Sequence, residues 1–227
     1  FEALGAVEAW QAVGEFENIS ASGFNVDHGP LQHPEKSHTF VNKWNVPVKW
    51  FNLERSRPDK WVDLTRHFYA DDAIIYAQTF CNSPEAREVQ FRIGTSGSVK
   101  VWVNDKLAFA DPEERNVDLD NYVFKTKLEK GYNRILVQIG NSEISASNFM
   151  LRITDEQGEA YSDLSFSREM KPYPKDTYNY EASVVADKTE KHFLDKIAAD
   201  PEDLESILIL SQYYLFKEES FKAKQLL

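Results

Sequence analysis

Apolar and polar residues alternate with a period of two through the middle of the chain, from Arg87 to Ile153. The alternation runs through EVQFRIGTSGSVKVWVNDKLAF, NYVFKTKLEKGYNRILVQIG and NFMLRITD. Successive side chains of a pleated strand point to opposite faces, so this pattern predicts antiparallel strands with one buried face. The core residues that it predicts are Phe91, Ile93, Val99, Val101, Val103, Ile135, Val137, Ile139, Phe149 and Leu151.

Residues that favour tight reversals separate these runs. Gly94-Thr95-Ser96-Gly97, Asn104-Asp105 and Lys130-Gly131 have the composition of hairpin turns. Two further strand-like stretches, WVDLTRHFY and AIIYAQTF, precede them. We therefore expect a mainly β fold, an antiparallel jelly-roll β-sandwich over residues 1–165.

The periodicity changes in the C-terminal part of the chain. Residues 166–187 are polar and contain the run KPYPKDTYNY, which predicts a linker or an edge wrap after the last strand. Apolar residues then recur every three and four positions. This spacing predicts three helices, over residues 188–199, 202–216 and 218–227.

The second and third predicted helices resemble a tetratricopeptide repeat. Such repeats bury their apolar faces only by stacking on neighbours, so the resemblance implies the start of a helical array over residues 188–227 and a natural chain that continues. A generic helical hairpin is the alternative. The positions that carry the resemblance are Leu204, Ile207, Leu210, Ser211, Tyr214 and Ala223.

A second resemblance covers roughly residues 61–154. VWVNDKLAF followed by DLDNYVFKTKLEKGYNRILVQIGN is similar to the jelly-roll sugar-binding domain of glycoside hydrolase family two, a galactose-binding-like fold. Asn104-Asp105 stands where that family usually has Asn-Gly. The resemblance implies a non-catalytic domain, because the catalytic carboxylates of that family belong to a separate barrel.

The long stretch from Ile19 to Arg57 is irregular and rich in Gly, Pro, Asn and His. A connection of this length is usually functional or folds over a sheet face. Trp44, Trp50 and Trp61 lie in it or just after it. Since pyranose rings stack on aromatic faces, these three are the candidate ligand-binding residues; the alternative is that they close the end of the sandwich.

We predict no metal site among the histidines of this stretch. His28, His33 and His38 recur every five residues, but a loop gives no fixed face on which they would converge, and no cysteine or well-placed carboxylate completes a set. Carboxylates also gather around the hairpin that follows residue 104. They could hold a structural calcium ion, although a solvated acidic face is the preferred interpretation.

Composition excludes several classes of partner. The 227 residues include 26 Lys and Arg against 37 Asp and Glu, a net charge of −11, which opposes binding to nucleic acid. No apolar run is long enough to predict a membrane span. The single cysteine, Cys81, lies in an apolar run and is expected to be buried and inert.

No catalytic constellation can be found in the sequence, so we expect no enzymatic activity and no required cofactor. Trp10 to Asn18 (WQAVGEFEN) resembles the opening strand of sandwich modules in multidomain exported bacterial proteins. We therefore expect a recognition or assembly module of a periplasmic or extracellular bacterial protein. Its partner would be a glycan or a neighbouring protein domain; the alternatives are a structural scaffold and an accessory domain of a hydrolase.

Overall fold

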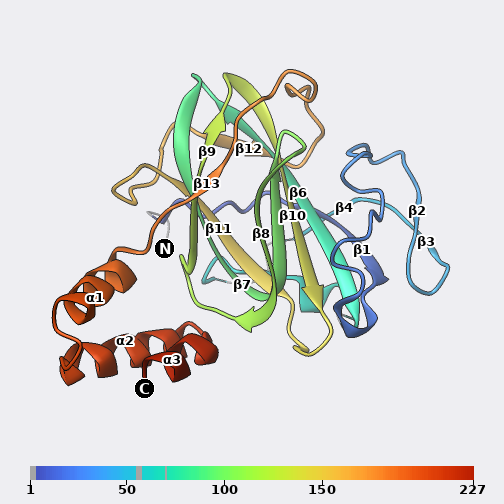
Figure 1. Cartoon of the computed structure of the whole chain (residues 1–227). Coiled ribbons are helices and arrows are strands. Elements are labelled where there is room, and N and C mark those ends of the chain that lie inside the picture. Colours follow the sequence, from blue (N-terminus) through green and yellow to red (C-terminus); the bar gives the residue numbers. More distant parts are fainter. Residues whose placement is uncertain (1–3, 55–57, 70) are drawn as a thin grey trace. The chain divides into compact units, whose positions relative to one another are not determined.

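The computed structural model describes residues 4–54, 58–69 and 71–227 (Figure 1). The chain divides into two compact units, Phe1–Val184 and Val185–Leu227. All strands assigned in the described residues belong to the first unit, and all α-helices assigned there belong to the second. The prediction of a mainly β fold with a small helical segment is confirmed at this level.

Eleven of the strands in the described residues form one sheet, in which every pairing is antiparallel. The other two, β2 and β3, pair only with each other. The strands are β1 (Gln11–Glu17), β2 (Phe40–Val41), β3 (Pro47–Val48), β4 (Phe51–Asn52), β5 (Val62–Asp63), β6 (Ala73–Ser83), β7 (Arg87–Val103), β8 (Lys106–Asn116), β9 (Tyr122–Leu128), β10 (Gly131–Asn141), β11 (Asn148–Thr154), β12 (Ser165–Ser167) and β13 (Ser183–Val184).

Strand β7 connects the two parts of the large sheet. Its first half pairs with β9 on one side and β11 on the other. Its second half pairs instead with β8 and β10, and the sheet continues from β10 through β6 and β1 to β4. One strand therefore has four partners, two along each half.

The predicted reversal at Gly94–Gly97 is wrong, because β7 continues through these residues. The glycines lie where β7 exchanges one pair of partners for the other. Gly97 has a φ of +112°, which side chains rarely tolerate, and a Cβ atom on Gly94 would collide with the carbonyl of Asp118. The glycines are thus needed for the backbone geometry at which β7 changes its partner strands, and not for a reversal of the chain.

The reversal at Asn104-Asp105 is confirmed. Both residues have positive φ angles, 49° and 66°, and they connect β7 to β8. Positive φ at both central residues is the geometry of the tight hairpin turn that suits twisted strands. Gly131, at the third predicted reversal, also has a positive φ, and β10 begins there.

One apolar core receives side chains from both halves of β7 and from their separate neighbours. All ten predicted core residues belong to it, and each has no exposed surface, so this prediction is confirmed. Because strands with different partners bury their side chains in the same cluster, the sheet folds around this core. Cys81 is buried in it as well, and burial raises the pKa of its thiol to about 12, which keeps the thiol protonated and inert.

The segment after β11 lies against the first unit for much of its length. Strand β12 pairs with β6, β13 pairs with β9, and Tyr178 between them is buried in the main core. Residues 166–187, for which the sequence predicts a linker or an edge wrap, therefore include contacts with the large sheet up to β13.

The second unit contains α1 (Lys188–Ala199), α2 (Leu204–Phe216) and α3 (Ser220–Leu226). These helices agree with the three predicted from apolar spacing. Their common core is small: Leu210, Tyr214 and Ala223 are buried, with Phe193 and Ile197 of α1 packed against them.

Candidate functional site

The irregular stretch of residues 19–50, called the covering segment below, lies on the outer face of the sheet. That face carries a second apolar cluster, separate from the main core. Phe40 and Trp50 of the covering segment pack into this cluster, with Leu31 and Val48 at its margin. The sheet contributes Val13, Phe16, Ile74, Tyr76, Trp102 and Leu136.

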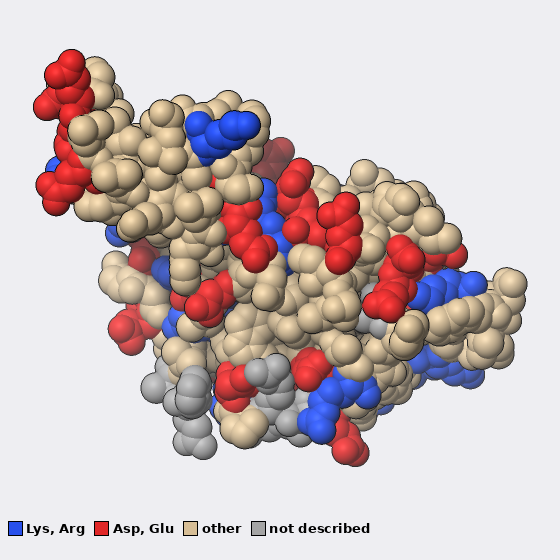
Figure 2. Space-filling model, turned by 90° about the horizontal axis from the view of Figure 1, so that it is seen from below, with Lys and Arg blue, Asp and Glu red and all other residues tan. Residues whose placement is uncertain are grey.

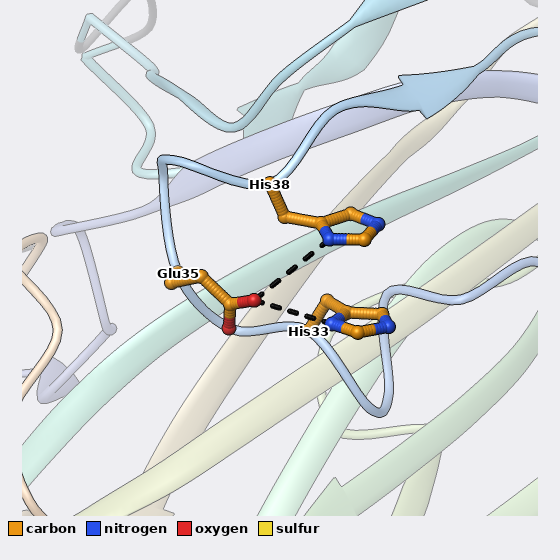
Figure 3. A group of neighbouring side chains, drawn as sticks. All are labelled: His33, Glu35 and His38. Atoms are coloured by element: carbon orange, nitrogen blue, oxygen red, sulfur yellow. Dashed lines mark hydrogen bonds and ion pairs between the residues drawn. The ribbon is translucent and has the colours of Figure 1, made fainter.

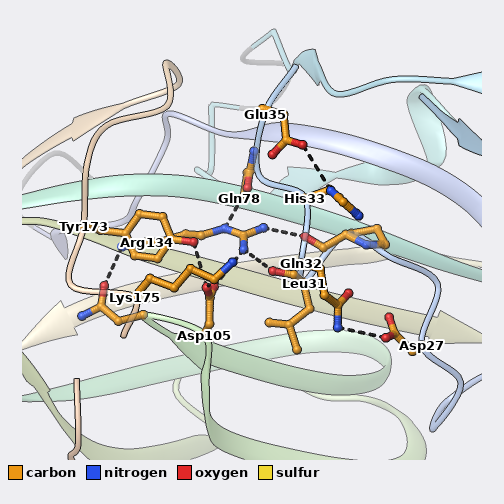
Figure 4. A network of polar contacts seen from close by, with 12 residues as sticks. Asp27, Leu31, Gln32, His33, Glu35, Gln78, Asp105, Arg134, Tyr173 and Lys175 are labelled. Atoms are coloured by element: carbon orange, nitrogen blue, oxygen red, sulfur yellow. Dashed lines mark hydrogen bonds and ion pairs between the residues drawn. The ribbon is translucent and has the colours of Figure 1, made fainter. Parts of the chain in front are cut away.

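A buried arginine ties the covering segment to the sheet. The Arg134 side chain of β10 has no exposed surface. Its Nε donates to Gln78 Oε1 at 3.0 Å, and its two terminal nitrogens donate to the carbonyls of Pro30 and Leu31, both at 2.6 Å (Figure 4). Nη1 also contacts Asp105 Oδ1 at 2.8 Å, so the charge is paired inside the fold.

Two more buried donors fix the next turn of the covering segment. Gln78 Nε2 donates to the carbonyl of Pro34 at 2.8 Å, and Trp50 Nε1 donates to the carbonyl of His33 at 2.8 Å. The backbone carbonyls of residues 30, 31, 33 and 34 are therefore held by side chains that are themselves buried.

This anchored stretch leads into a cluster of His33, Glu35 and His38 (Figure 3). The Nδ1 atoms of both imidazoles face Glu35 Oε1, at 3.2 Å from His33 and 3.8 Å from His38. The rings are stacked, with centroids 3.7 Å apart and an interplanar angle of 7°. Burial opposes ionisation of Glu35, but a backbone hydrogen bond and the two imidazoles outweigh it and lower the pKa of the carboxyl.

The structure differs from the sequence analysis on both reasons for dismissing these histidines. Buried side chains give the loop a fixed conformation, and Glu35 supplies the carboxylate. His28, in contrast, stacks on Phe16 and contacts the Gly23 carbonyl, so it is not part of the cluster. The spacing H-x-E-x-x-H, with a carboxylate between two histidines, is the signal in the sequence that points to this site.

Beyond His38 the covering segment forms the β2–β3 hairpin, at the edge of the first unit (Figure 1). Asn42 Oδ1 accepts hydrogen bonds from the backbone N–H groups of Trp44 and Val46, at 3.0 and 2.9 Å. Trp44 is 53% exposed at the tip, and Lys43 Nζ lies 4.7 Å from the centroid of its ring. The hairpin thus presents an indole on an ordered turn.

The three candidate tryptophans occupy different environments. Trp44 is exposed, whereas Trp50 is only 4% exposed because it fills the second apolar cluster. Trp61 is partly buried, and the edge of its ring lies over Gly94 of β7. Only Trp44, of the three, offers a largely exposed ring to a ligand.

Most carboxylates around the β7–β8 hairpin have partners within the protein. Asp111 pairs with Arg115, and Glu114 accepts from the hydroxyl of Ser142 at 2.8 Å. Acidic side chains are spread over the face drawn in Figure 2, and several of them lie next to basic ones. Among the described residues, three side chains suited to a metal ion come together in the His33 cluster. The described carboxylates of the β7–β8 hairpin do not form such a group.

A separate cleft of about 270 Å³ lies beside β7 and β9. Its lining is largely polar or charged: Glu88, Val89, Gln90, Lys125, Asp155, Glu156, Gln157 and Tyr161. It is smaller than the usual pocket for an organic ligand. Among the described residues, no helix has the length and apolar content needed to span a membrane.

Neither a family model nor a curated protein matches this chain. Among solved structures, it is similar to a β-glucosidase from Kluyveromyces marxianus in complex with glucose (18% identity, TM-score 0.40), covering 68% of this chain and 17% of that one. It is also similar to a GH31 α-xylosidase from Xanthomonas citri (14% identity, TM-score 0.36), covering 86% of this chain and 18% of that one.

A third structure is an anti-sigma factor domain-containing protein from Clostridium clariflavum (17% identity, TM-score 0.33), with 46% of this chain and 35% of that one covered. The chain thus spans a minor part of each of these longer proteins. These neighbours include glycoside hydrolases. Because their TM-scores are low, the fold of this chain is defined by its own strand pairings.

Proposed function

We propose that this chain is a non-catalytic recognition module of a larger, exported bacterial protein, built as a jelly-roll sandwich. Its contact element is the β2–β3 hairpin, and its ligand is a glycan that stacks on Trp44. The observation that carries the proposal is the exposed indole on an ordered turn.

The surroundings of Trp44 support this role. The Lys43 side chain lies near the indole ring, and Lys43 is itself fixed to buried Glu15, both by its backbone N–H and by an ion pair of 3.5 Å. The flanking Val41 and Val46 are exposed as well, at 60% and 48%. Because the backbone that carries the ring is ordered, little backbone entropy is lost on binding, which favours a contact with a sugar ring.

The test is binding of the purified chain to an array of immobilised glycans, followed by calorimetry with the oligosaccharide that binds best. Trp44→Ala should weaken binding at least about tenfold, whereas Trp44→Phe, which keeps an aromatic face, should retain most of it. Leu107→Ala is the matched control, because Leu107 is equally exposed at 53% but lies on β8.

Equal glycan binding by Trp44→Ala and the unaltered chain would show that the hairpin is not the contact element. Glycoside hydrolysis by the purified chain, abolished by substitution of a single Asp or Glu, would contradict the non-catalytic part of the proposal.

A second function, assembly with another protein domain, is favoured by the helical unit. Leu204, Leu208, Leu215, Phe216 and Phe221 of α2 and α3 are all more than half exposed. Leu210, Tyr214 and Ala223 are buried at positions of the tetratricopeptide pattern, which supports a repeat-like role. Under this alternative the unit would bind a neighbouring helical domain, and a Leu208→Lys, Phe216→Lys variant would lose that association while keeping glycan binding.

A further inference from the structure

We propose that His33, Glu35 and His38 form a binding site for a divalent transition-metal ion, with Zn²⁺ the preferred ion. Two imidazole nitrogens and one carboxylate oxygen are a donor set that suits zinc. Three protein ligands leave one position of a tetrahedral site for water, which fits the exposure of these side chains: 42% for His33, 38% for Glu35 and 33% for His38.

The distances between the donor atoms fit such a site. Bonds of about 2.0–2.1 Å at tetrahedral angles place neighbouring ligand atoms roughly 3.3 Å apart. Glu35 Oε1 lies 3.2 Å from Nδ1 of His33 and 3.8 Å from Nδ1 of His38, and all three donor atoms lie within 4.8 Å of one another. The same nitrogen of each ring faces the carboxylate (Figure 3).

The backbone that carries these ligands is fixed before any metal arrives. The carbonyls of His33 and Pro34 accept from Trp50 and Gln78, both buried, and the backbone N–H of His38 donates to the Glu35 carbonyl at 3.2 Å. Figure 4 shows this stretch lying against the Arg134 network. Metal binding would therefore require little ordering of the chain.

One local change is needed. The lone pair of an imidazole nitrogen lies in the ring plane, and the planes of His33 and His38 are within 7° of parallel, so the two rings must open from their stack to share one ion. His38 rests on Phe40, with ring centroids 4.7 Å apart, whereas His33 is the more exposed ring. We therefore expect His33 to make the larger movement.

The experiment is a titration of the full 227-residue chain, prepared without a polyhistidine tag, with Zn²⁺ by calorimetry and with Co²⁺ by visible absorption. We expect one equivalent to bind, with the d–d absorption of a tetrahedral Co²⁺ complex and a melting temperature that rises with metal concentration. Long-range ¹H–¹⁵N spectra should show that Nδ1, not Nε2, of His33 and His38 shifts.

Glu35→Gln should weaken Zn²⁺ binding at least about tenfold, since even loss of a residue that supports a ligand costs that much. His33→Ala, His38→Ala should abolish it. His192→Ala, which removes an exposed histidine of α1, is the control and should leave it unchanged.

Circular dichroism in the absence of metal would confirm that the variants fold. Absence of stoichiometric binding by the unaltered chain, or equal binding by the folded double variant, would overturn the proposal. Because these readouts involve no glycan, they are independent of the role proposed for Trp44.

Discussion

Arg134 lies on a sheet face that the alternation along β10 predicts to be solvated. Val137 and Ile139 point into the main core, whereas Leu136 belongs to the outer apolar cluster and Arg134 bonds to the covering segment there. The covering segment removes this face from water. The burial of the face depends on residues distant in sequence, so the period-two pattern of β10 does not predict it.

Arg134→Met is predicted to destabilise the first unit by roughly 3–5 kcal/mol, because it leaves Asp105 and the Pro30 and Leu31 carbonyls without their buried donor. Urea unfolding followed by tryptophan fluorescence measures this loss. Lys125→Met, which removes an exposed ion pair with Glu156, should change the midpoint little. Similar midpoints for the two variants would refute the anchoring role of Arg134.

Val101→Asp should unfold the first unit. Val101 has no exposed surface, and an unpaired charge in an apolar interior costs several kcal/mol, comparable to the whole stability of a domain. Leu107→Asp, on the exposed side of β8, is the control and should remain folded. If the Val101→Asp variant still unfolded cooperatively in urea, as followed by tryptophan fluorescence, the assignment of this core would be contradicted.

The ten core positions could be predicted from sequence because each obeys a local rule, the alternation of a strand. For the His33 cluster, the spacing H-x-E-x-x-H identifies the residues but not their convergence, which depends on Gln78 and Trp50 holding the loop from other parts of the chain. In the sequence, Trp44 and Trp50 have similar surroundings, and nothing local tells them apart. Only the tertiary fold makes one ring exposed and the other buried.

At the scale of elements, long periodic segments were predictable and short ones were not. β6, β7 and β10 carry enough residues to show a period, and the three helices do as well. β2, β3 and β4 have two residues each, too few for any period. β2 and β3 pair with each other within the covering segment, and β4 pairs with β1 at the edge of the large sheet. All three strands are thus consequences of the fold rather than of local propensity.

The N-terminus of α1 has a well-defined cap. Asp187 Oδ1 accepts from the backbone N–H groups of Thr189 and Glu190, at 2.9 and 3.1 Å. Its other oxygen accepts from the Tyr213 hydroxyl and from Lys217 Nζ. Burial opposes ionisation of Asp187, but these hydrogen bonds outweigh it and lower the pKa of the carboxyl.

This cap predicts a stability change with pH in the helical unit. Since the pKa of Asp187 is lower in the folded unit than in the unfolded chain, its contribution is complete above the ordinary aspartate pKa of about 3.9 and is lost as pH falls through the folded value. Asp187→Ala should cost about 1 kcal/mol near neutral pH and flatten the acid dependence of the helical ellipticity.

Asp195→Ala is the control for that experiment, because the ion pair that Asp195 makes with Lys191 of the same helix is exposed. An acid transition of the helices that is the same in Asp187→Ala and in the unaltered chain would show that another group is responsible.

At the scale of the whole molecule, the two units have separate cores of very different size. The first unit buries two apolar clusters, whereas the buried apolar side chains of the second are Leu210, Tyr214 and Ala223 within 43 residues, Val185–Leu227. A unit this small has little apolar burial to offset its conformational entropy. It should be the less stable of the two.

The distribution of chromophores makes this testable in the intact chain. Every tryptophan (Trp10, Trp44, Trp50, Trp61 and Trp102) belongs to the first unit, so tryptophan fluorescence reports only that unit, whereas helical ellipticity reports mainly the second. We predict that urea abolishes the helical signal at a lower concentration than the one that shifts the fluorescence. The Asp187→Ala variant should widen the gap by moving the helical transition alone. Coincident transitions in both proteins would mean that the units unfold cooperatively, as one body.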